Sequence, residues 1–257
     1  TENAGATIID SAVVIADADN LNFNLGSLRV GISEADDSAT DILSIVHEGT
    51  GASQIGVSGG TVSYAGVDIG TLTGGTGGID LVIAFNSSAT AASVNDLVQQ
   101  IAFNSTSEDP TFTRSTRTIN FTLVDGDGIA NSGADMVAVS STLTITPVND
   151  PPVVTLTSAN GYTENGSAVT VLSSGLILSN VDDTQLTGSV VSISTGYTAG
   201  DTLAVTVTGN ITVASNLNGV LTLTGADSFA NYKTVLDSIT YVSSSNDPTA
   251  GGTAAAR

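Results

Sequence analysis

Hydrophobic and polar residues alternate along much of the chain with a period of two. The clearest stretch runs from Thr118 to Val124, where Ile119, Phe121 and Leu123 alternate with threonine and asparagine. This period places successive side chains on opposite faces of a β-strand, so the stretch predicts a half-buried strand. The same reasoning predicts strands at 7–15, 27–32, 42–47, 61–64, 80–85 and 136–146, and later at 168–172, 176–179, 189–194, 203–208, 211–214 and 219–224.

Helical patterns are weak by comparison. Two segments, 93–101 and 228–239, carry apolar residues at helical spacing, including Leu97, Val98 and Leu236. We expect each segment to form one or two turns that pack across the end of a sheet. Many short strands with few helices predict an all-β fold class. Because only 4% of the residues are aromatic, the core must be aliphatic, which suits the small layers of β-sandwiches.

The alternation ends at Thr146, and three prolines follow between residues 147 and 152. Because proline fixes φ and lacks a backbone donor, this segment cannot continue a central strand. We therefore expect a short, extended and stiff connector. Asn149 and Asp150 lie between the prolines, and their side-chain and carbonyl oxygens are suitable ligands for a hard cation such as Ca²⁺.

A sequence repeat indicates two domains. The tripeptide Thr-Glu-Asn at 1–3 reappears at 163–165, and the segment 97–112 resembles the segment 235–250. Self-similarity of this kind is typical of tandem repeats. The predicted domains cover residues 1–150 and 151–257.

The two copies differ in length. The Thr-Glu-Asn motif recurs after 162 residues, whereas Asp109-Pro110 recurs after 138 residues as Asp247-Pro248. The first copy therefore holds about 24 additional residues. We expect them in the glycine-rich region from Ser33 to Gly78, as long hairpins or loops that decorate the fold without building its core.

The second copy reaches Arg257 at the point where two strands of the first copy are still to come. The second domain is therefore expected to lack its last two strands in this chain. Two explanations stay open: the chain is a fragment of a longer array, or a neighbouring molecule adds strands to the exposed edge.

The charge is strongly negative, with 25 acidic residues against five basic ones and a net charge of −20. Nucleic acids and anionic membranes both attract basic surfaces, so neither is an expected partner. Clustered carboxylates repel one another, and in a folded protein a bound cation commonly neutralises them. For the scattered acidic residues, the simpler interpretation is a charged and soluble surface.

The chain has no cysteine, which excludes disulfides, zinc–thiolate sites and thiol catalysis. His47 is the only histidine, and no acid/base pair lies in a recognisable motif, so an enzyme is not expected. The sequence contains no apolar run of membrane-spanning length and no signal peptide at its start, so membrane insertion is not expected. Few lysines and no cysteine are compatible with an exported bacterial protein.

Four motifs occur in order: TEN at residue 1, DADN at 17, VDGDG at 124 and TITPVNDPP at 144. In this order they resemble the cadherin repeat, and more narrowly the bacterial cadherin-like tandem repeats of very large secreted adhesins of the RTX and biofilm type. The resemblance covers the first copy from end to end and the second copy as far as it extends. It implies tandem Greek-key β-sandwiches, cadherin-like or immunoglobulin-like, with Ca²⁺ bound between successive domains.

The resemblance also implies which residues bind Ca²⁺ at the joint between the two copies. They are the glutamate of the first motif, an acid beside the Asp-Pro motif, the linker residues and the paired aspartates of the second copy. The chain departs from the family pattern because its paired aspartates are adjacent, in place of Asp-x-Asp. The ligands implied here are Glu2, Glu108 or Asp109, Asn149, Asp150, Asp182 and Asp183.

By the same resemblance, each outer end of the pair carries part of a further site. Asp17, Asp19 and Asp125, with Asp127, are implied at one end, and Glu164 and Asp247 at the other. Residues 124–128 have two other interpretations. One is an EF-hand-like loop, in which Asn131 and Asp135 are poor substitutes for the usual ligands. The other is a tight turn that uses Asp and Gly for backbone reasons.

The function expected from this resemblance is mechanical. The chain would be a calcium-stiffened structural or adhesive module of a large secreted bacterial protein, at the cell surface or in an extracellular matrix, biofilm or filament. Its expected partners are neighbouring repeats, other copies through strand addition, and a cell-surface or glycan ligand. The alternative is a carbohydrate-binding β-sandwich module, for which the sandwich shape and the loop-rich region 33–78 are the arguments. A concave face with exposed tyrosines would favour it.

Overall fold

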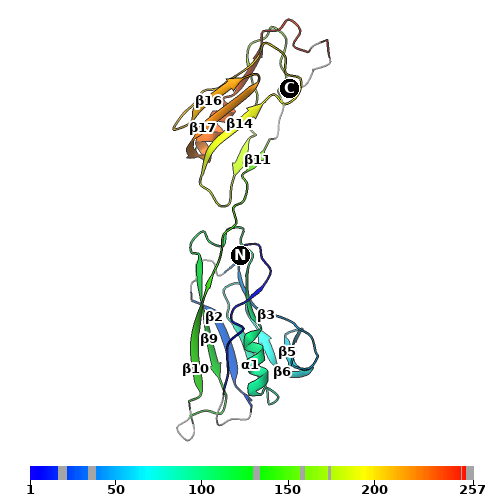
Figure 1. Cartoon of the computed structure of the whole chain (residues 1–257), viewed down its shortest axis with the longest axis vertical. Helices are drawn as coiled ribbons and strands as arrows, with labels where there is room; N and C mark the ends of the chain where they lie inside the picture. Colours follow the sequence, from blue (N-terminus) through cyan, green and yellow to red (C-terminus); the bar gives the residue numbers. More distant parts are fainter. Residues whose placement is uncertain are drawn as a thin grey trace. The chain divides into compact units, whose positions relative to one another are not determined.

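A computed structural model describes residues 1–16, 22–33, 39–129, 134–156, 160–172, 175–249 and 251–252. This part of the chain is mostly β, with several antiparallel sheets and two short helices (Figure 1). The β-rich character predicted from the alternation is thus confirmed. The chain divides into two compact units, Thr1–Val148 and Asn149–Arg257, called the first and second unit below.

The first unit contains ten strands and one helix in its described residues. They are β1 Thr7–Ile8, β2 Ser27–Ile32, β3 Asp41–Ile45, β4 Ile55–Ser58, β5 Thr61–Tyr64, β6 Val67–Thr73, β7 Leu81–Phe85, α1 Ala91–Gln99, β8 Ile101–Ser105, β9 Thr116–Val124 and β10 Met136–Thr144. Seven strands form one sheet in the order β10-β9-β2-β7-β6-β5-β4, and three form another in the order β1-β8-β3.

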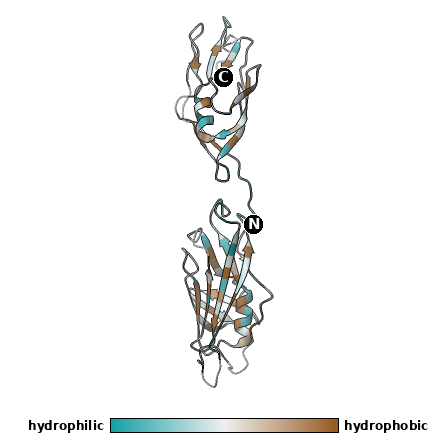
Figure 2. Cartoon of the chain, turned by 90° about the vertical axis from the view of Figure 1, so that its left-hand side faces the viewer, coloured by the Kyte–Doolittle hydropathy of each residue, from teal (hydrophilic) through white to brown (hydrophobic). Residues whose placement is uncertain are grey.

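The core of the first unit follows from the predicted alternation. In β9, Ile119, Phe121 and Leu123 are buried, while the residues between them are more exposed. Figure 2 shows hydrophobic and hydrophilic residues interspersed along the strands of the chain. The predicted helix is present as α1. Thr90 caps its N-terminus by accepting a hydrogen bond from Ser93, and Leu97 is fully buried.

The surplus residues of the first unit do not merely decorate the fold. They form the hairpin β4–β5, and its Ile55 and Val62 are fully buried and belong to the core. The expectation of loops outside the core is therefore wrong for this hairpin. The reason is that β5 pairs with β6 and so extends the large sheet, which carries the hairpin's apolar side chains over the same core.

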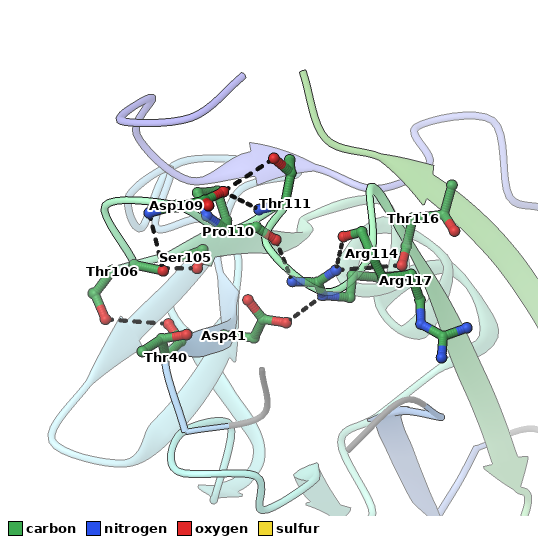
Figure 3. Close-up of polar contacts among 11 residues, drawn as sticks. Thr40, Asp41, Ser105, Thr106, Asp109, Pro110, Thr111, Arg114, Thr116 and Arg117 are labelled. Atoms are coloured by element: carbon green, nitrogen blue, oxygen red, sulfur yellow. Dashed lines mark hydrogen bonds and ion pairs between the residues drawn. The ribbon is translucent and has the colours of Figure 1, made fainter. Parts of the chain in front are cut away.

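A buried ion pair closes the connection between β8 and β9. The side chain of Arg117 is almost fully buried, and its Nε donates to Asp41 Oδ2 at 2.6 Å. The same guanidinium donates to the carbonyls of Pro110 and Arg114 at 2.8 and 2.7 Å (Figure 3). One arginine thus anchors the whole turn that leads into β9, a role that the sequence analysis did not assign to it.

The second unit contains eight strands and one helix in its described residues. They are β11 Val153–Thr155, β12 Val169–Thr170, β13 Ile177–Ser179, β14 Gln185–Ser192, β15 Asp201–Ala204, β16 Thr212–Leu217, β17 Val220–Ser228, α2 Phe229–Asp237 and β18 Thr240–Ser243. The sheets have the orders β11-β13, β12-β18-β15 and β14-β17-β16. The core gathers Leu221, Tyr232, Val235 and Ile239.

The sequence repeat is also visible in structure. Asn3 and Asn165 both have positive φ angles, 56° and 55°, and each lies in a turn closed by a hydrogen bond back to the preceding threonine, Thr1 or Thr163. Asp41 opens β3 opposite Ser105 of β8, as Asp201 opens β15 opposite Ser243 of β18. Helix α1 precedes β8, as α2 precedes β18.

Several strands were not predicted. Strand β8 follows α1, and its first three residues, Ile101 to Phe103, are all buried, so both faces of the strand are covered there. A strand buried on both faces shows no alternation, so a period of two cannot reveal it. The strands missing from the prediction are β4, β6, β8, β11 and β18, and the segment predicted at 7–15 is paired only over β1.

Candidate metal centre

Glu2 lies where the first unit ends. Its backbone N–H donates to the carbonyl of Thr146 at 3.0 Å, and its carboxylate Oε2 accepts the backbone N–H of Val148 at 2.9 Å. Val148 is the last residue of the first unit. The carboxylate therefore binds the backbone of the segment that leads to the predicted linker.

The loop that carries Glu108 and Asp109 lies at the same end of the first unit. Glu2 and Pro110 line one cavity of about 90 Å³. Asp109 Oδ1 accepts two hydrogen bonds from Thr111, from its N–H at 3.0 Å and its hydroxyl at 3.1 Å, whereas Glu108 is exposed. Asp109 thus shapes the turn, and Glu108 extends from it into solvent.

In the second unit, the linker residue Asp150 is held by Asp182 and Asn180. Its N–H donates to Oδ2 of Asp182. Asn180 joins the group, because its Oδ1 accepts from the N–H of Asp182 at 3.0 Å and its Nδ2 donates to Asp183 at 3.3 Å and to the carbonyl of Asp150 at 3.4 Å. The structure therefore gathers Asp150, Asp182 and Asp183, three of the predicted ligands.

One oxygen in this group lacks a hydrogen-bond donor. Asp150 Oδ2 is buried and accepts no hydrogen bond from any described residue. A buried carboxylate oxygen without a donor is costly unless a cation binds it. Carboxylate and amide oxygens are the ligands that Ca²⁺ prefers, so the donor set around Asp150 fits this ion.

A second carboxylate group occupies the turn between β9 and β10. Single carboxylate oxygens of Asp125, Asp127 and Asp135 lie within 4.8 Å of one another. The N–H of Asp125 donates to the carbonyl of Asp135, and the N–H of Asp127 donates to Asp125 Oδ1, both at 3.2 Å. The nine-residue strand β10 separates this turn from the end of the unit that carries Glu2.

The turn is shaped by a close approach of two backbone segments. Gly126 has a φ of 89°, and a Cβ atom there would lie 2.4 Å from the nitrogen of Gly26. A Cβ on Gly26 would in turn lie 2.3 Å from the carbonyl of Val124. Only glycine fits at these two positions, so backbone geometry explains Gly126, the first glycine of the Asp-Gly-Asp-Gly sequence.

Asp135 was assigned only as a poor ligand of an EF-hand-like loop, yet it joins this group. It directly precedes β10, whose first residue Met136 pairs with Val124 at the end of β9. Asp125 and Asp135 are therefore cross-strand neighbours. The two alternating segments 118–124 and 136–146 are the signal in the sequence that could have found this contact. If they are paired as a hairpin, Asp125 and Asp135 become neighbours across the turn.

Two further predicted ligands, Glu164 and Asp247, belong to neither of these groups. Glu164 is exposed in the turn after Thr163, and Asp247 uses both carboxylate oxygens to accept the N–H of Gly251. This bond, with a second from the Thr249 hydroxyl, lowers the pKa of Asp247 below its usual range. Asp17 and Asp19 lie outside the described residues.

The tyrosines do not form a common exposed surface. Tyr232 and Tyr241 are buried, and Tyr241 contacts Tyr162 edge to face with ring centroids 5.0 Å apart. Tyr64 is half-buried, and Tyr197 is the one tyrosine of the five that is exposed. A sugar-stacking platform needs several exposed rings, so the described residues give the carbohydrate-binding alternative little support.

Comparison with protein-family models, with curated proteins and with solved structures returned no match. Within the part of the chain that the structure describes, neither helix is long and apolar enough to cross a membrane. The functional argument therefore depends on the acidic groups themselves.

Proposed function

We propose that this chain is a calcium-stiffened structural or adhesive module of a large extracellular protein, of the kind found at bacterial surfaces. One observation carries the proposal. The Glu2 carboxylate binds the N–H of Val148 in the first unit, and the Asp182 carboxylate binds the N–H of Asp150 in the second unit. Carboxylates thus bind the backbone immediately before and after Asn149.

The chemistry of Ca²⁺ explains how such a joint would work. The ion takes about six to eight oxygen ligands and accepts irregular geometry. The Glu2 carboxylate supplies two oxygens at most, so it cannot hold the ion alone. An ion that drew ligands from Glu2, Asp150 and Asp182 would restrict the angle between the units, because the ligands belong to both. It would also relieve repulsion in a chain with a net charge of −20.

The fold type belongs to the same proposal. Each unit is proposed to be a Greek-key β-sandwich of the cadherin-like kind. The two sheets of the first unit, with Ile119 of the large sheet and Ile101 of the small sheet both in one core, support this assignment. The module would act outside the cell, with neighbouring repeats as its partners.

Small-angle X-ray scattering with Ca²⁺ and with a chelator tests the proposal. Calcium is expected to lengthen the particle and to reduce its flexibility. The variant Asp182→Asn keeps an oxygen that can accept the Asp150 N–H but removes a charge, so it should respond only at higher calcium concentrations. A profile of the unaltered chain that is the same with Ca²⁺ and with chelator would reject the proposal.

A matched control comes from Asp68, an exposed acidic residue of β6 that belongs to neither acidic group. Asp68→Asn removes the same charge. It should leave the calcium response unchanged, which separates binding at the joint from a general effect of net charge.

A further inference from the structure

The edge strand β14 of the second unit corresponds to a central strand of the first unit. Strand β2 pairs with β7, where Leu28 lies opposite Ile83, and β14 pairs with β17, where Val191 lies opposite Leu221. Ile83 and Leu221 are both fully buried and are separated by the same 138 residues as the helix caps Thr90 and Ser228. Strands β2 and β14 thus occupy the same position beside equivalent core strands.

The two strands differ on their other side. Strand β2 also pairs with β9, and Leu28 lies opposite Leu123 and is fully buried. Among the described residues, β14 pairs with β17 alone, and Val191 is only partly buried. The Ser189 hydroxyl on the same strand is buried without a hydrogen-bond partner among described residues. The β14 edge therefore has unpaired backbone groups beside an incompletely covered core.

The second unit also reproduces the turn that leads into β9. In the first unit the N–H of Asp109 donates to Ser107 Oγ at 3.2 Å, and the Thr111 hydroxyl donates to the Asp109 carboxylate. In the second unit Asp247 makes the same contacts with Ser245 and Thr249, both at 3.1 Å. The chain therefore leaves β18 with the turn geometry that it has after β8.

A buried aspartate is the first residue of β3 in the first unit and of the equivalent strand β15 in the second unit. Asp41 begins β3 and binds Arg117, a buried residue of β9. Asp201 begins β15 in the equivalent register and is also buried. Its oxygens accept the Tyr241 hydroxyl at 2.6 Å and the Thr198 N–H at 2.9 Å. The position that receives the β9 arginine in the first unit is thus acidic in the second unit as well.

We propose that the free edge of β14 binds an antiparallel strand of the β9 type, delivered from the C-terminal side of β18. This strand would carry apolar side chains at alternate positions, one of them over Val191, and an arginine directed to Asp201. The first unit supplies the reason for this occupant, because the equivalent edge of β2 is covered by β9 in this way. The matching turn at Asp247 favours delivery along the same polypeptide over pairing with a second copy.

A graft within the full chain tests the proposal. Residues 252–257 are replaced by a copy of residues 114–146, which contains β9 and β10 and keeps the first-unit spacing from the Asp-Pro motif. Hydrogen–deuterium exchange then follows the amides of β14. Alternate amides that gain a partner should exchange more slowly by roughly tenfold or more, consistent with one new hydrogen bond in a protected strand.

Two variants within the grafted copy are the controls. Replacing a leucine of the copy, Leu123→Asn, keeps the length but removes the apolar side chain opposite Val191, and it should abolish the protection. Replacing the arginine of the copy, Arg117→Met, should weaken the protection, and Asp201→Asn should weaken it to a similar extent. All measurements are made with chelator present, so their outcome is independent of the calcium proposal.

Unchanged exchange of β14 in the graft would overturn the proposal. So would equal protection by the graft and by its Leu123→Asn variant, because the pairing would then not depend on the β9 pattern. Protection of β14 in the ungrafted chain that increases with protein concentration, together with a dimer in analytical ultracentrifugation, would assign the edge to a second copy and would also overturn it.

Discussion

Arg117 is the side chain on which the end of the first unit most depends. It is almost fully buried and binds Asp41, whose other oxygen, Oδ1, is buried without a hydrogen-bond partner among described residues. A buried charge that loses its partner cannot recover hydration. The arginine also holds the carbonyls of Pro110 and Arg114, so the turn before β9 depends on it as well.

Replacement of this arginine should therefore be strongly destabilising. Arg117→Met is expected to lower the free energy of unfolding of the first unit by about 3–5 kcal/mol, because it leaves the Asp41 carboxylate buried and unpaired. Chemical denaturation followed by circular dichroism measures the change. The matched control is Arg29→Met, which removes an exposed ion pair with Asp80 and should cost less than about 1 kcal/mol. Equal losses in the two variants would contradict this account.

Asp227 stabilises the second unit in a pH-dependent manner. Its oxygens accept the N–H of Asn210 at 2.7 Å, the Nδ2 of Asn231 at 2.7 Å and the N–H of Ser228 at 2.8 Å. These bonds, that from Asn210 above all, favour the ionised carboxylate and lower its pKa. Because the folded pKa lies below the unfolded one, the stabilisation is complete above the unfolded pKa and is lost as the pH falls through the folded pKa.

The variant Asp227→Asn should remove this acid-side dependence. Between pH 7 and about pH 2, the melting temperature of the second unit should fall less steeply in the variant than in the unaltered chain. At pH 7 the variant should be the less stable of the two, because a neutral amide accepts these hydrogen bonds less strongly. Asp68→Asn serves as the control and should keep the original slope. Parallel curves for Asp227→Asn and the unaltered chain would disprove the assignment.

Among the elements, the hairpin β4–β5 contributes more than its sequence suggests. Glycines on both sides of it indicate a surface decoration, but Ile55 and Val62 are fully buried in the core of the first unit. The second unit has no such hairpin among its described residues. The first unit accommodates the insertion because β5 pairs with β6 at the edge of the large sheet. The apolar side chains of the hairpin are then buried in the core of the unit.

Truncation of one hairpin side chain tests this role. Ile55→Ala is expected to lower the free energy of unfolding of the first unit by about 2–5 kcal/mol, through lost burial and a cavity. Val67→Ala, at an exposed position of neighbouring β6, should cost much less. If Ile55→Ala also cost under about 0.5 kcal/mol, the hairpin would be a dispensable decoration after all.

At the scale of the whole molecule, the strongly negative net charge can be compensated in two ways, by general screening or by specific cation binding. A net charge of −20 is self-repelling, and added salt of any kind would screen that repulsion. A specific site behaves differently, because a ligand that binds only the folded state stabilises it in proportion to the logarithm of its concentration.

Calcium should therefore stabilise the chain beyond the effect of ionic strength. At a Ca²⁺ concentration about one hundred times the dissociation constant, linkage predicts about 2.7 kcal/mol of added stability. Differential scanning calorimetry in Ca²⁺ is compared with NaCl at equal ionic strength. The variant Asp150→Asn should lose most of the difference. An identical rise in both salts would show that the acids act only through general charge.

The predicted groups differ in how far the sequence could define them. Asp150 and the pair Asp182-Asp183 were assigned from motifs. Asp150 and Asp182 are 32 positions apart, and they meet because β11 pairs with β13, with Val153 opposite Ser179. Asp135 and Arg117 were missed as partners. The Arg117 contact joins residues 76 positions apart, and such a contact depends on which strands pair.

The sequence by itself determined the β-rich character, the two short helices, the repeated turns at Thr-Glu-Asn and Asp-Pro, and the alternating core of β9. These features depend on residues within one turn or one strand, where side-chain period and backbone preference act directly. Only the tertiary structure decided that β8 is central, that β4–β5 belongs to the core, and that β2 is covered on both edges while β14 is covered on one. Strand pairing joins distant segments, and the alternation of a strand shows which face is buried without showing which neighbour lies at its edge.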